Sequence, residues 1–252
     1  MTEPRVALVS GGGRGIGAAI SLALAGDGMD VAINYRKDEE SARQVASLIE
    51  AMGRRAGVYQ ASVDDYEADA RMVDAVLADF GYVDTLVHSA GIASRGQSVV
   101  DTDPAEIERV WRTHAFGAFA LAQLVVPSMR TRPRGDVVLI SSAASKAMSG
   151  NSSPYNMAKA AMEALAHTLS KEERQHGIHV NIVAPGLVDT DMGRRLAKAV
   201  MGAGDDIHSI DERMPFGHVC SPEEVADVVA WVVSDAARYV NNQYIGVDGG
   251  ML

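Results

Sequence analysis

The 252-residue sequence contains a single cysteine, Cys220, so it can form no disulfide within the chain and no cysteine cage around a metal. Such sparse cysteine is typical of a reducing compartment. The sequence also lacks an apolar run near the roughly 18 residues that a membrane-spanning helix needs. Its first residues lack the charged-then-apolar pattern of a signal peptide. We therefore expect a cytoplasmic protein with no metal site and no membrane association.

Basic residues are also in deficit: 23 Lys and Arg against 33 Asp and Glu leave a net charge of −10. This balance argues against a nucleic-acid partner, which requires a basic surface, and against docking on anionic membranes. Hydrophobic residues make up 47% of the chain, enough for a sizeable core. No linker, low-complexity tract or internal repeat interrupts the sequence, so we predict one domain over residues 1–252.

Short apolar runs alternate with longer amphipathic stretches along the chain. The runs cover residues 6–9, 31–34, 57–61, 85–88, 137–141, 179–183 and 244–247. Helix starts are marked by Asp103-Pro104 and Ser221-Pro222, each with an acceptor at the N-cap and Glu at the third helical position. This alternation predicts an α/β fold, in which a seven-stranded parallel sheet is flanked by helices.

A glycine cluster follows the first predicted strand and opens a helix. Its glycines allow close backbone approach to a pyrophosphate, and the helix start offers free N–H groups with a partial positive charge. We predict that this loop, residues 10–17, binds a dinucleotide. The residues expected to contact it are Ser10, Gly11, Gly13, Arg14, Gly15, Ile16 and Gly17.

The end of the second predicted strand discriminates between NAD and NADP. An NAD site usually has Asp or Glu there for the ribose hydroxyls. Here the sequence reads Asn34-Tyr35-Arg36-Lys37, without an acid. Arg14 and Arg36 therefore become candidates for binding a 2′-phosphate through paired hydrogen bonds, which favours NADP over NAD. The alternative is that both arginines are solvated surface residues.

Tyr155 and Lys159 lie four residues apart at the start of a helical stretch, so they share one face. A nearby ammonium lowers the pKa of a phenol from about 10, which suits tyrosine for general acid–base chemistry. Ser142 lies thirteen residues upstream of Tyr155, at the carboxyl end of the fifth predicted strand. Ligands of open α/β sheets bind at that edge, where a serine can hydrogen-bond a substrate oxygen.

Taken together and in this order, these segments resemble the short-chain dehydrogenase/reductase family, whose members have a Rossmann-type doubly wound fold. The family's glycine loop, Tyr-x-x-x-Lys pair and upstream serine correspond to residues 10–17, Tyr155 with Lys159, and Ser142. Its Pro-Gly motif corresponds to Pro185-Gly186, with Thr190 and Met192 following, and its C-terminal ending to Val247-Asp248-Gly249-Gly250. The chain is most similar to the subgroup of 3-oxoacyl-acyl-carrier-protein reductases.

The resemblance implies a ketone–alcohol oxidoreductase that works by hydride transfer. Ser142 would orient the substrate carbonyl, Tyr155 would exchange the proton, and Lys159 would hold the cofactor's ribose and tune the phenol. Residues 187–214 would form a mobile substrate lid, and the protein would be a homotetramer. The remaining implied cofactor contacts are Ser62, Val63, Ser89, Ala90, Gly91, Tyr155, Lys159, Pro185, Gly186, Val188 and Thr190.

Three positions depart from the family pattern. The family's Asn-Asn-Ala-Gly reads His88-Ser89-Ala90-Gly91, and the adenine-contacting Asp-Val pair reads Ser62-Val63. The asparagine that supports a water chain to the lysine is replaced by His114. Since imidazole titrates near pH 6.5, His114 is a candidate fourth catalytic residue in a proton relay. The alternative is a histidine that only fills space.

The substrate is less well defined. The predicted lid and the loop before Tyr155 are rich in apolar side chains, which suit a small to medium-sized neutral ketone or alcohol. These are Met148, Met192, Leu196, Ala199, Val200, Met201 and Met214. A 3-oxoacyl thioester is the second candidate, with the basic cluster of Arg130, Arg132 and Arg134 as a docking point for an acyl carrier protein. The cluster's other interpretation is a helix-end cap.

Two further functions compete with the reductase. One is a nucleotide-binding sensor that has lost catalysis, which the unusual residues at positions 62, 88 and 114 keep open. The other is a lyase or epimerase that uses bound NAD, which the arginine pair disfavours. The intact set of Ser142, Tyr155 and Lys159 favours the enzyme that reduces or oxidises a carbonyl substrate.

Overall fold

Each of the seven predicted apolar runs forms a β-strand in the computed structural model, which describes residues 3–251. The strands are β1 (Val6–Ser10), β2 (Asp30–Tyr35), β3 (Ala56–Gln60), β4 (Thr85–His88), β5 (Gly135–Ile140), β6 (Ile178–Pro185) and β7 (Tyr244–Val247). All are parallel and lie in the order β3-β2-β1-β4-β5-β6-β7. The predicted α/β fold with a seven-stranded parallel sheet is confirmed.

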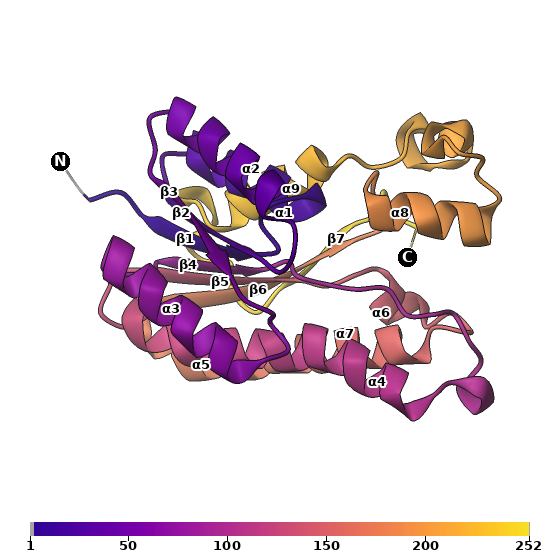
Figure 1. Cartoon of the computed structure of the whole chain (residues 1–252), viewed down its shortest axis with the longest axis horizontal. Helices are drawn as coiled ribbons and strands as arrows, with labels where there is room; N and C mark the ends of the chain where they lie inside the picture. The colour runs from indigo at the N-terminus through magenta and orange to yellow at the C-terminus, as the bar shows by residue number, and fades with distance from the viewer. Residues whose placement is uncertain (1–2, 252) are drawn as a thin grey trace.

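The central strands are buried on both faces, which explains their continuous apolar sequences. Alternate residues belong to two separate cores. Leu8 and Leu139 contribute to the core on one face, while Val9 and Ile140 contribute to the core on the other. Helices cover both faces, so the sheet is the middle layer of three (Figure 1).

One face is covered by α1 (Gly15–Gly26), α2 (Glu39–Ala51) and α9 (Pro222–Val232). The other is covered by α3 (Tyr66–Phe80), α4 (Pro104–Trp111), α5 (Gly117–Met129) and α7 (Ser153–Glu173), as Figure 1 shows. Both predicted helix starts are confirmed. The Asp103 side chain accepts a hydrogen bond from Ala105 N at the start of α4, and Ser221 with Glu224 forms a capping box at the start of α9.

Helices α4 and α5 are joined without a loop by a π-helical turn over Arg112–Phe116. The wider turn rotates the residues within it relative to a regular helix. Thr113 and His114 are buried in this turn. The residue types alone do not reveal this turn, because a π-turn changes the hydrogen-bond ladder without changing the apolar spacing.

The short helices α6 (Ala144–Ala147) and α8 (Asp191–Leu196) lie beyond the carboxyl ends of the strands (Figure 1). The segment after β6 that contains α8 has a small core of its own. Its buried members are Ala197, Ala203, Ile207, Ile210, Met214 and Val219, with Leu187 and Met201 packed against them. Met214 is buried in this core and the partly buried Met201 packs against it, so both stabilise the segment internally. That they also line a substrate pocket stays a prediction. Leu196 and Val200 remain exposed apolar side chains.

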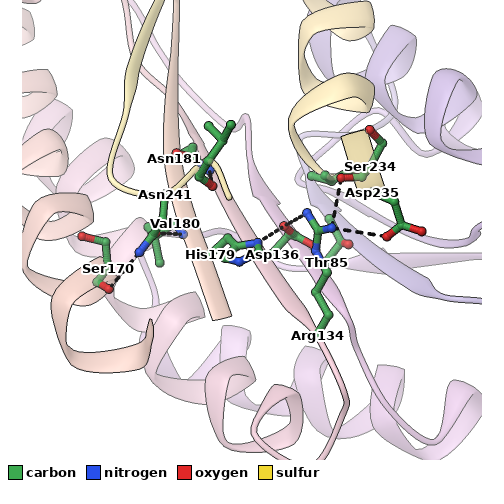
Figure 2. A network of polar contacts seen from close by, with 12 residues as sticks. Thr85, Arg134, Asp136, Ser170, His179, Val180, Asn181, Ser234, Asp235 and Asn241 are labelled. Carbon is green, nitrogen blue, oxygen red and sulfur yellow. Dashed lines mark hydrogen bonds and ion pairs between the residues drawn. The ribbon is translucent and has the colours of Figure 1, made fainter. Parts of the chain in front are cut away.

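At the amino ends of the strands, opposite the end where α6 and α8 lie, ion pairs hold neighbouring segments together (Figure 2). Asp136, buried at the start of β5, accepts hydrogen bonds from Arg134 Nε at 3.0 Å and Nη2 at 2.9 Å. It also pairs with Arg5 and lies 3.5 Å from His179 Nδ1. Figure 2 shows Arg134 reaching outward to Asp235, whose side chain is fully exposed. Asp136 thus joins the start of β5 to the chain before β1 and to the region after α9.

The three arginines of the predicted basic cluster each have a carboxylate partner. Arg130, at the C-cap of α5, pairs with Glu173 at 2.6 Å, Arg132 with Asp84 at 2.9 Å, and Arg134 with Asp136. The cluster is therefore more than a helix-end cap. Its charges are matched within the protein, and this removes the reason for predicting an acyl-carrier-protein contact there.

We predict that Asp136→Ala lowers the free energy of unfolding by about 3 kcal/mol, because it leaves partly buried arginines without their shared carboxylate. Urea unfolding followed by circular dichroism measures the change. Asp235→Ala is the matched control, since it removes the solvent-exposed partner of the same Arg134 and should leave stability unchanged. Equal losses in the two variants would contradict the central role of Asp136.

Candidate active site

The glycine loop lies between β1 and α1 at the carboxyl edge of the sheet. A Cβ added at Gly17 would lie 2.2 Å from Gly11 O, and one at Gly13 would lie 2.9 Å from the Cα of Ala42 on α2. Gly11 and Gly15 have positive φ angles of 63° and 53°. The loop therefore needs glycine for its path and its packing. Its flat backbone and the uncapped start of α1 fit a pyrophosphate.

The turn after β4 packs directly against this loop. The buried Ser10 Oγ accepts hydrogen bonds from Ser89 N and Ala90 N, each at 3.1 Å, and lies 3.0 Å from His88 Nδ1. A Cβ on Gly11 would lie 3.0 Å from the Cα of Ala90. The structure thus brings the predicted residues Ser10, Gly11, Ser89 and Ala90 together. Because the Ser10 hydroxyl already bonds to the turn after β4, this side chain holds that turn against the glycine loop.

Asn34, which was not among the predicted site residues, ties the same loop to β2. Its Oδ1 accepts a hydrogen bond from Gly11 N at 3.2 Å, and its backbone oxygen accepts one from Gly12 N at 3.0 Å. Asn34 is buried although it lies in an otherwise apolar strand. A buried polar group requires partners, and an isolated amide in such a strand is the signal that could have identified it.

Arg36 lies just after β2, where an NADP 2′-phosphate would bind, and Arg14 lies in the glycine loop at the start of α1; both are exposed. A hydrogen bond from Ser41 N, together with the positive charge of Arg14, lowers the pKa of Asp38. Arg14 therefore reaches the neighbourhood of residues 36–38 although it belongs to the glycine loop. Ser62 and Val63 follow β3 at the same edge, and Val63 O would lie 2.7 Å from a Cβ on Gly117.

Helix α7 carries Tyr155 and Lys159 to the end of β5. The helix begins at Ser153, so both residues lie in its first two turns, as expected from the sequence. Lys159 is buried and its Nζ donates to Ile140 O at 2.7 Å, while the ammonium lies 5.6 Å from the centre of the Tyr155 ring. Ser142 follows β5 within reach of Tyr155. The three predicted catalytic residues therefore meet at one place.

Burial shifts both key pKa values. Desolvation lowers the pKa of Lys159 to about 7, partly offset by the negative charge of Glu163. Desolvation raises the pKa of Tyr155, and the Ser142 hydroxyl lowers it by a smaller amount. The sequence-based expectation of a lowered Tyr155 pKa is therefore wrong for the protein without its cofactor, since desolvation is the largest cause of the shift and raises the pKa.

His114 projects from the π-turn toward Tyr155, with the ring centres 5.3 Å apart and the planes nearly perpendicular. Its Nε2 lies 2.9 Å from Ile92 O and 3.2 Å from Ile92 N. One imidazole nitrogen either donates or accepts, so it satisfies one of these groups. An asparagine amide offers both functions. Nδ1 of His114 is buried and has no hydrogen-bond partner among the described residues.

The expectation that His114 titrates near pH 6.5 is also wrong. Burial, with a further contribution from the charge of Lys159, holds the pKa of His114 well below its usual value. The same causes lower the pKa of His88 to about 3. Both histidines are neutral at physiological pH.

The segment after β6 completes the edge. Pro185 ends the strand, and a Cβ on Gly186 would lie 3.2 Å from the Cβ of Asp248. Val188 is buried and forms a bridge with Cys220. Thr190 accepts a hydrogen bond from Gly193 N at 3.0 Å, and its methyl group would lie 3.3 Å from a Cβ on Gly15. The predicted residues of this segment therefore lie next to the glycine loop.

No group of three or more His, Cys, Asp or Glu side chains within residues 3–251 is arranged to hold a metal ion. In that same part of the chain, no helix combines the length and the hydropathy needed to cross a membrane.

Comparison with known proteins agrees with this geometry. Residues 11–252 match the family model described as Enoyl-(Acyl carrier protein) reductase. Versicolorin reductase 1 of Aspergillus parasiticus is 35% identical over 98% of this chain and 96% of its own. The 3-oxoacyl-[acyl-carrier-protein] reductase FabG of Staphylococcus epidermidis is 33% identical over 97% and 98%.

Two solved structures extend the likeness. A short-chain dehydrogenase from Burkholderia cenocepacia in complex with NADP has a TM-score of 0.87, is 35% identical, and is matched over 98% of this chain and 97% of its own. L-Sorbose reductase from Gluconobacter frateurii, complexed with NADPH and L-sorbose, has a TM-score of 0.91, is 29% identical, and is matched over 99% and 97%. The chain therefore belongs to the short-chain dehydrogenase/reductase family of oxidoreductases.

Proposed function

We propose that the protein interconverts a ketone and a secondary alcohol by hydride transfer with NADP(H). The observation that carries this proposal is the meeting of Tyr155 and Lys159 on α7 with Ser142 after β5, at the edge that also holds the glycine loop. When bound, the cofactor supplies or accepts the hydride. The side chains of this protein orient the substrate and transfer the proton.

Ser142 orients the substrate carbonyl by hydrogen-bonding its oxygen, and Tyr155 donates its phenolic proton to that oxygen as the carbon is reduced. The reverse reaction returns the proton to Tyr155. The cation of Lys159 stabilises the phenolate that remains after the proton is given up. The burial of Lys159 strengthens this electrostatic effect.

The cofactor would be held along the carboxyl edge. Residues 10–17 would bind the pyrophosphate, Ser62 and Val63 the adenine, residues 89–91 the adjoining backbone, and Lys159 the nicotinamide ribose. Pro185, Gly186, Val188 and Thr190 would hold the nicotinamide end. Residues 187–214 would close over the substrate as a lid, which their separate small core supports.

A small to medium-sized, largely neutral ketone fits the exposed apolar side chains near this edge, Met148, Leu196 and Val200. A 3-oxoacyl thioester is the second candidate, supported by the likeness to 3-oxoacyl-[acyl-carrier-protein] reductases. A nucleotide-binding sensor without turnover is the alternative outside catalysis. Oxidation of NADPH with a panel of ketones, diketones and 3-oxoacyl thioesters separates these functions.

A homotetramer is supported by exposed aromatic and apolar side chains on three helices, Trp111, Phe119 and Met157. Sedimentation velocity measures this assembly directly. The protein's net charge of −10 and lone cysteine continue to favour a cytoplasmic setting.

Tyr155→Phe should lower kcat for ketone reduction by about a thousandfold, because the proton donor is removed. The dissociation constant for NADPH, measured by fluorescence, should stay unchanged. Tyr59→Phe is the matched control, since its hydroxyl bonds Asp79 in another part of the molecule. Full activity of Tyr155→Phe would exclude this mechanism, and NADPH binding without turnover of any substrate by the wild type would favour the sensor.

Arg14→Ala and Arg36→Ala should each raise KM for NADPH about tenfold and leave KM for NADH unchanged, because only NADPH carries the 2′-phosphate. Steady-state kinetics with both nucleotides measures the difference. The matched control is Arg43→Ala, an exposed arginine on neighbouring α2 that pairs with Glu39. A wild type that prefers NADH would overturn the NADP assignment.

We also propose that His114 serves the proton relay as a neutral acceptor through Nδ1. His114→Ala should lower kcat about tenfold, while His114→Asn should keep it within about threefold, because an amide restores a polar relay group. Neither change should move the acidic limb of the pH profile, since His114 is already neutral there. Wild-type kcat and pH profile in His114→Ala would refute the relay.

A further inference from the structure

Glu163 continues the polar face of α7 by one more turn, since it lies four residues after Lys159 and eight after Tyr155. Its side chain is buried. Ser141 Oγ donates a hydrogen bond to Glu163 Oε1 at 2.5 Å. The face of α7 that carries Tyr155 and Lys159 therefore has a third polar residue. Glu163 was not a predicted site residue and has no role in the mechanism proposed above.

Consecutive residues at the end of β5 contact this face in turn. Ile140 O accepts from Lys159, Ser141 donates to Glu163, and Ser142 lies beside Tyr155. The bond to Glu163 lies between the two catalytic contacts along the strand. It holds the backbone from which Ser142 projects.

The second carboxylate oxygen of Glu163 faces outward. Lys146 Nζ of α6 donates to Oε2 at 3.3 Å, and the same ammonium lies 4.6 Å from the centre of the Tyr244 ring on β7. The Lys146 side chain is half exposed, at 52%, against 7% for Glu163. A buried carboxylate is costly without partners. Here Lys146, one of the two partners, is half exposed to solvent, so it neutralises the Glu163 carboxylate only in part. The remaining negative charge acts on groups buried near Glu163.

The buried charge that Glu163 acts on is the ammonium of Lys159. The groups that face it from other elements are His88 at the end of β4 and His114 in the π-turn, and both are neutral because burial lowers their pKa values. On its own helix it faces Tyr155, whose phenol is protonated, and Glu163. Among the described residues around Lys159, Glu163 is the carboxylate whose charge supports the cation.

We propose that Glu163 is a positioning residue of this active site, which keeps Lys159 cationic by its charge and fixes Ser142 through its hydrogen bond to Ser141. This inference rests on the proposed function, since the charge of Lys159 matters through the phenolate of Tyr155. Lys146 opposes this effect, because its ammonium pairs with the Glu163 carboxylate from the solvent side and weakens the support that Glu163 gives to the Lys159 cation.

The direction of the pH effect follows from the lysine. Its pKa of about 7 means that the cation is present below pH 7 and is lost as the pH rises through that value. Removing the negative charge of Glu163 makes the cation less favourable, so the charge is lost at a lower pH. Removing Lys146 frees the carboxylate and removes a like charge, so the cation persists to a higher pH.

The experiment compares Glu163→Gln with Lys146→Met. Glu163→Gln keeps an acceptor for Ser141, and the alkaline limb of kcat/KM for ketone reduction should move to lower pH by about one unit. Lys146→Met should move the same limb in the opposite direction. Glu163→Asp, which keeps the charge, should restore most of the wild-type profile. Shifts of the same sign in Glu163→Gln and Lys146→Met would indicate loosening of the structure and overturn the proposal.

A second readout does not need turnover. The ¹⁵Nζ signal of Lys159, assigned by its loss in Lys159→Met, gives the protonation midpoint directly by NMR titration. The midpoint should fall in Glu163→Gln and rise in Lys146→Met. An unchanged midpoint in Glu163→Gln overturns the inference about Glu163. An inactive wild type with the expected shifts would overturn the proposed function and leave the electrostatic role intact.

Discussion

A buried hydrogen bond from Lys159 Nζ to Ile140 O fastens α7 to the end of β5, and the arrangement of the site depends on it. Successive residues of a helix are rotated by about 100°, so a shift of α7 by one residue would carry Tyr155 and Lys159 away from the strand end. With Lys159 anchored, Tyr155 lies one turn earlier against Ser142. The geometry of the proposed catalytic residues is thus a consequence of how one helix is held on one strand.

Buried charges are neutralised differently at the amino and carboxyl ends of the strands, called here the amino and carboxyl edges of the sheet. At the amino edge, buried carboxylates are matched by arginines, as in Asp136 with Arg134 and Asp84 with Arg132, and these pairs tie the strands together. At the carboxyl edge, Lys159 is buried beside neutral histidines and its pKa is lowered. The first edge is electrostatically satisfied and serves stability. The second is left responsive to a bound anion or a change in pH.

The substitutions at positions 88 and 114 fit this difference. An imidazole at position 114 is flat enough to lie against Gly91, where an added Cβ would meet its ring at 2.7 Å. It keeps a polar group next to Tyr155 without adding a second positive charge beside Lys159, because burial holds the ring neutral. The departure from the family pattern therefore changes the chemistry of one hydrogen-bonding position beside Tyr155.

Much of this protein was determined by its sequence alone. The spacing of apolar runs identified all seven strands to within two residues at every end, because strand burial on both faces leaves a local signature. The glycine loop and the set of Ser142, Tyr155 and Lys159 were predicted from their joint order along the chain and its resemblance to the family, and the structure brings them to one edge of the sheet. The tertiary structure alone decided the protonation behaviour, because desolvation depends on which elements pack around a group. It raised the pKa of Tyr155 where a lowering was expected and held the pKa of His114 well below its usual value. It also placed Met214, with the partly buried Met201 against it, in the small core of the segment after β6. It also brought Ser141, Glu163 and Lys146 together, a contact between a strand end and two helices that no local pattern encodes.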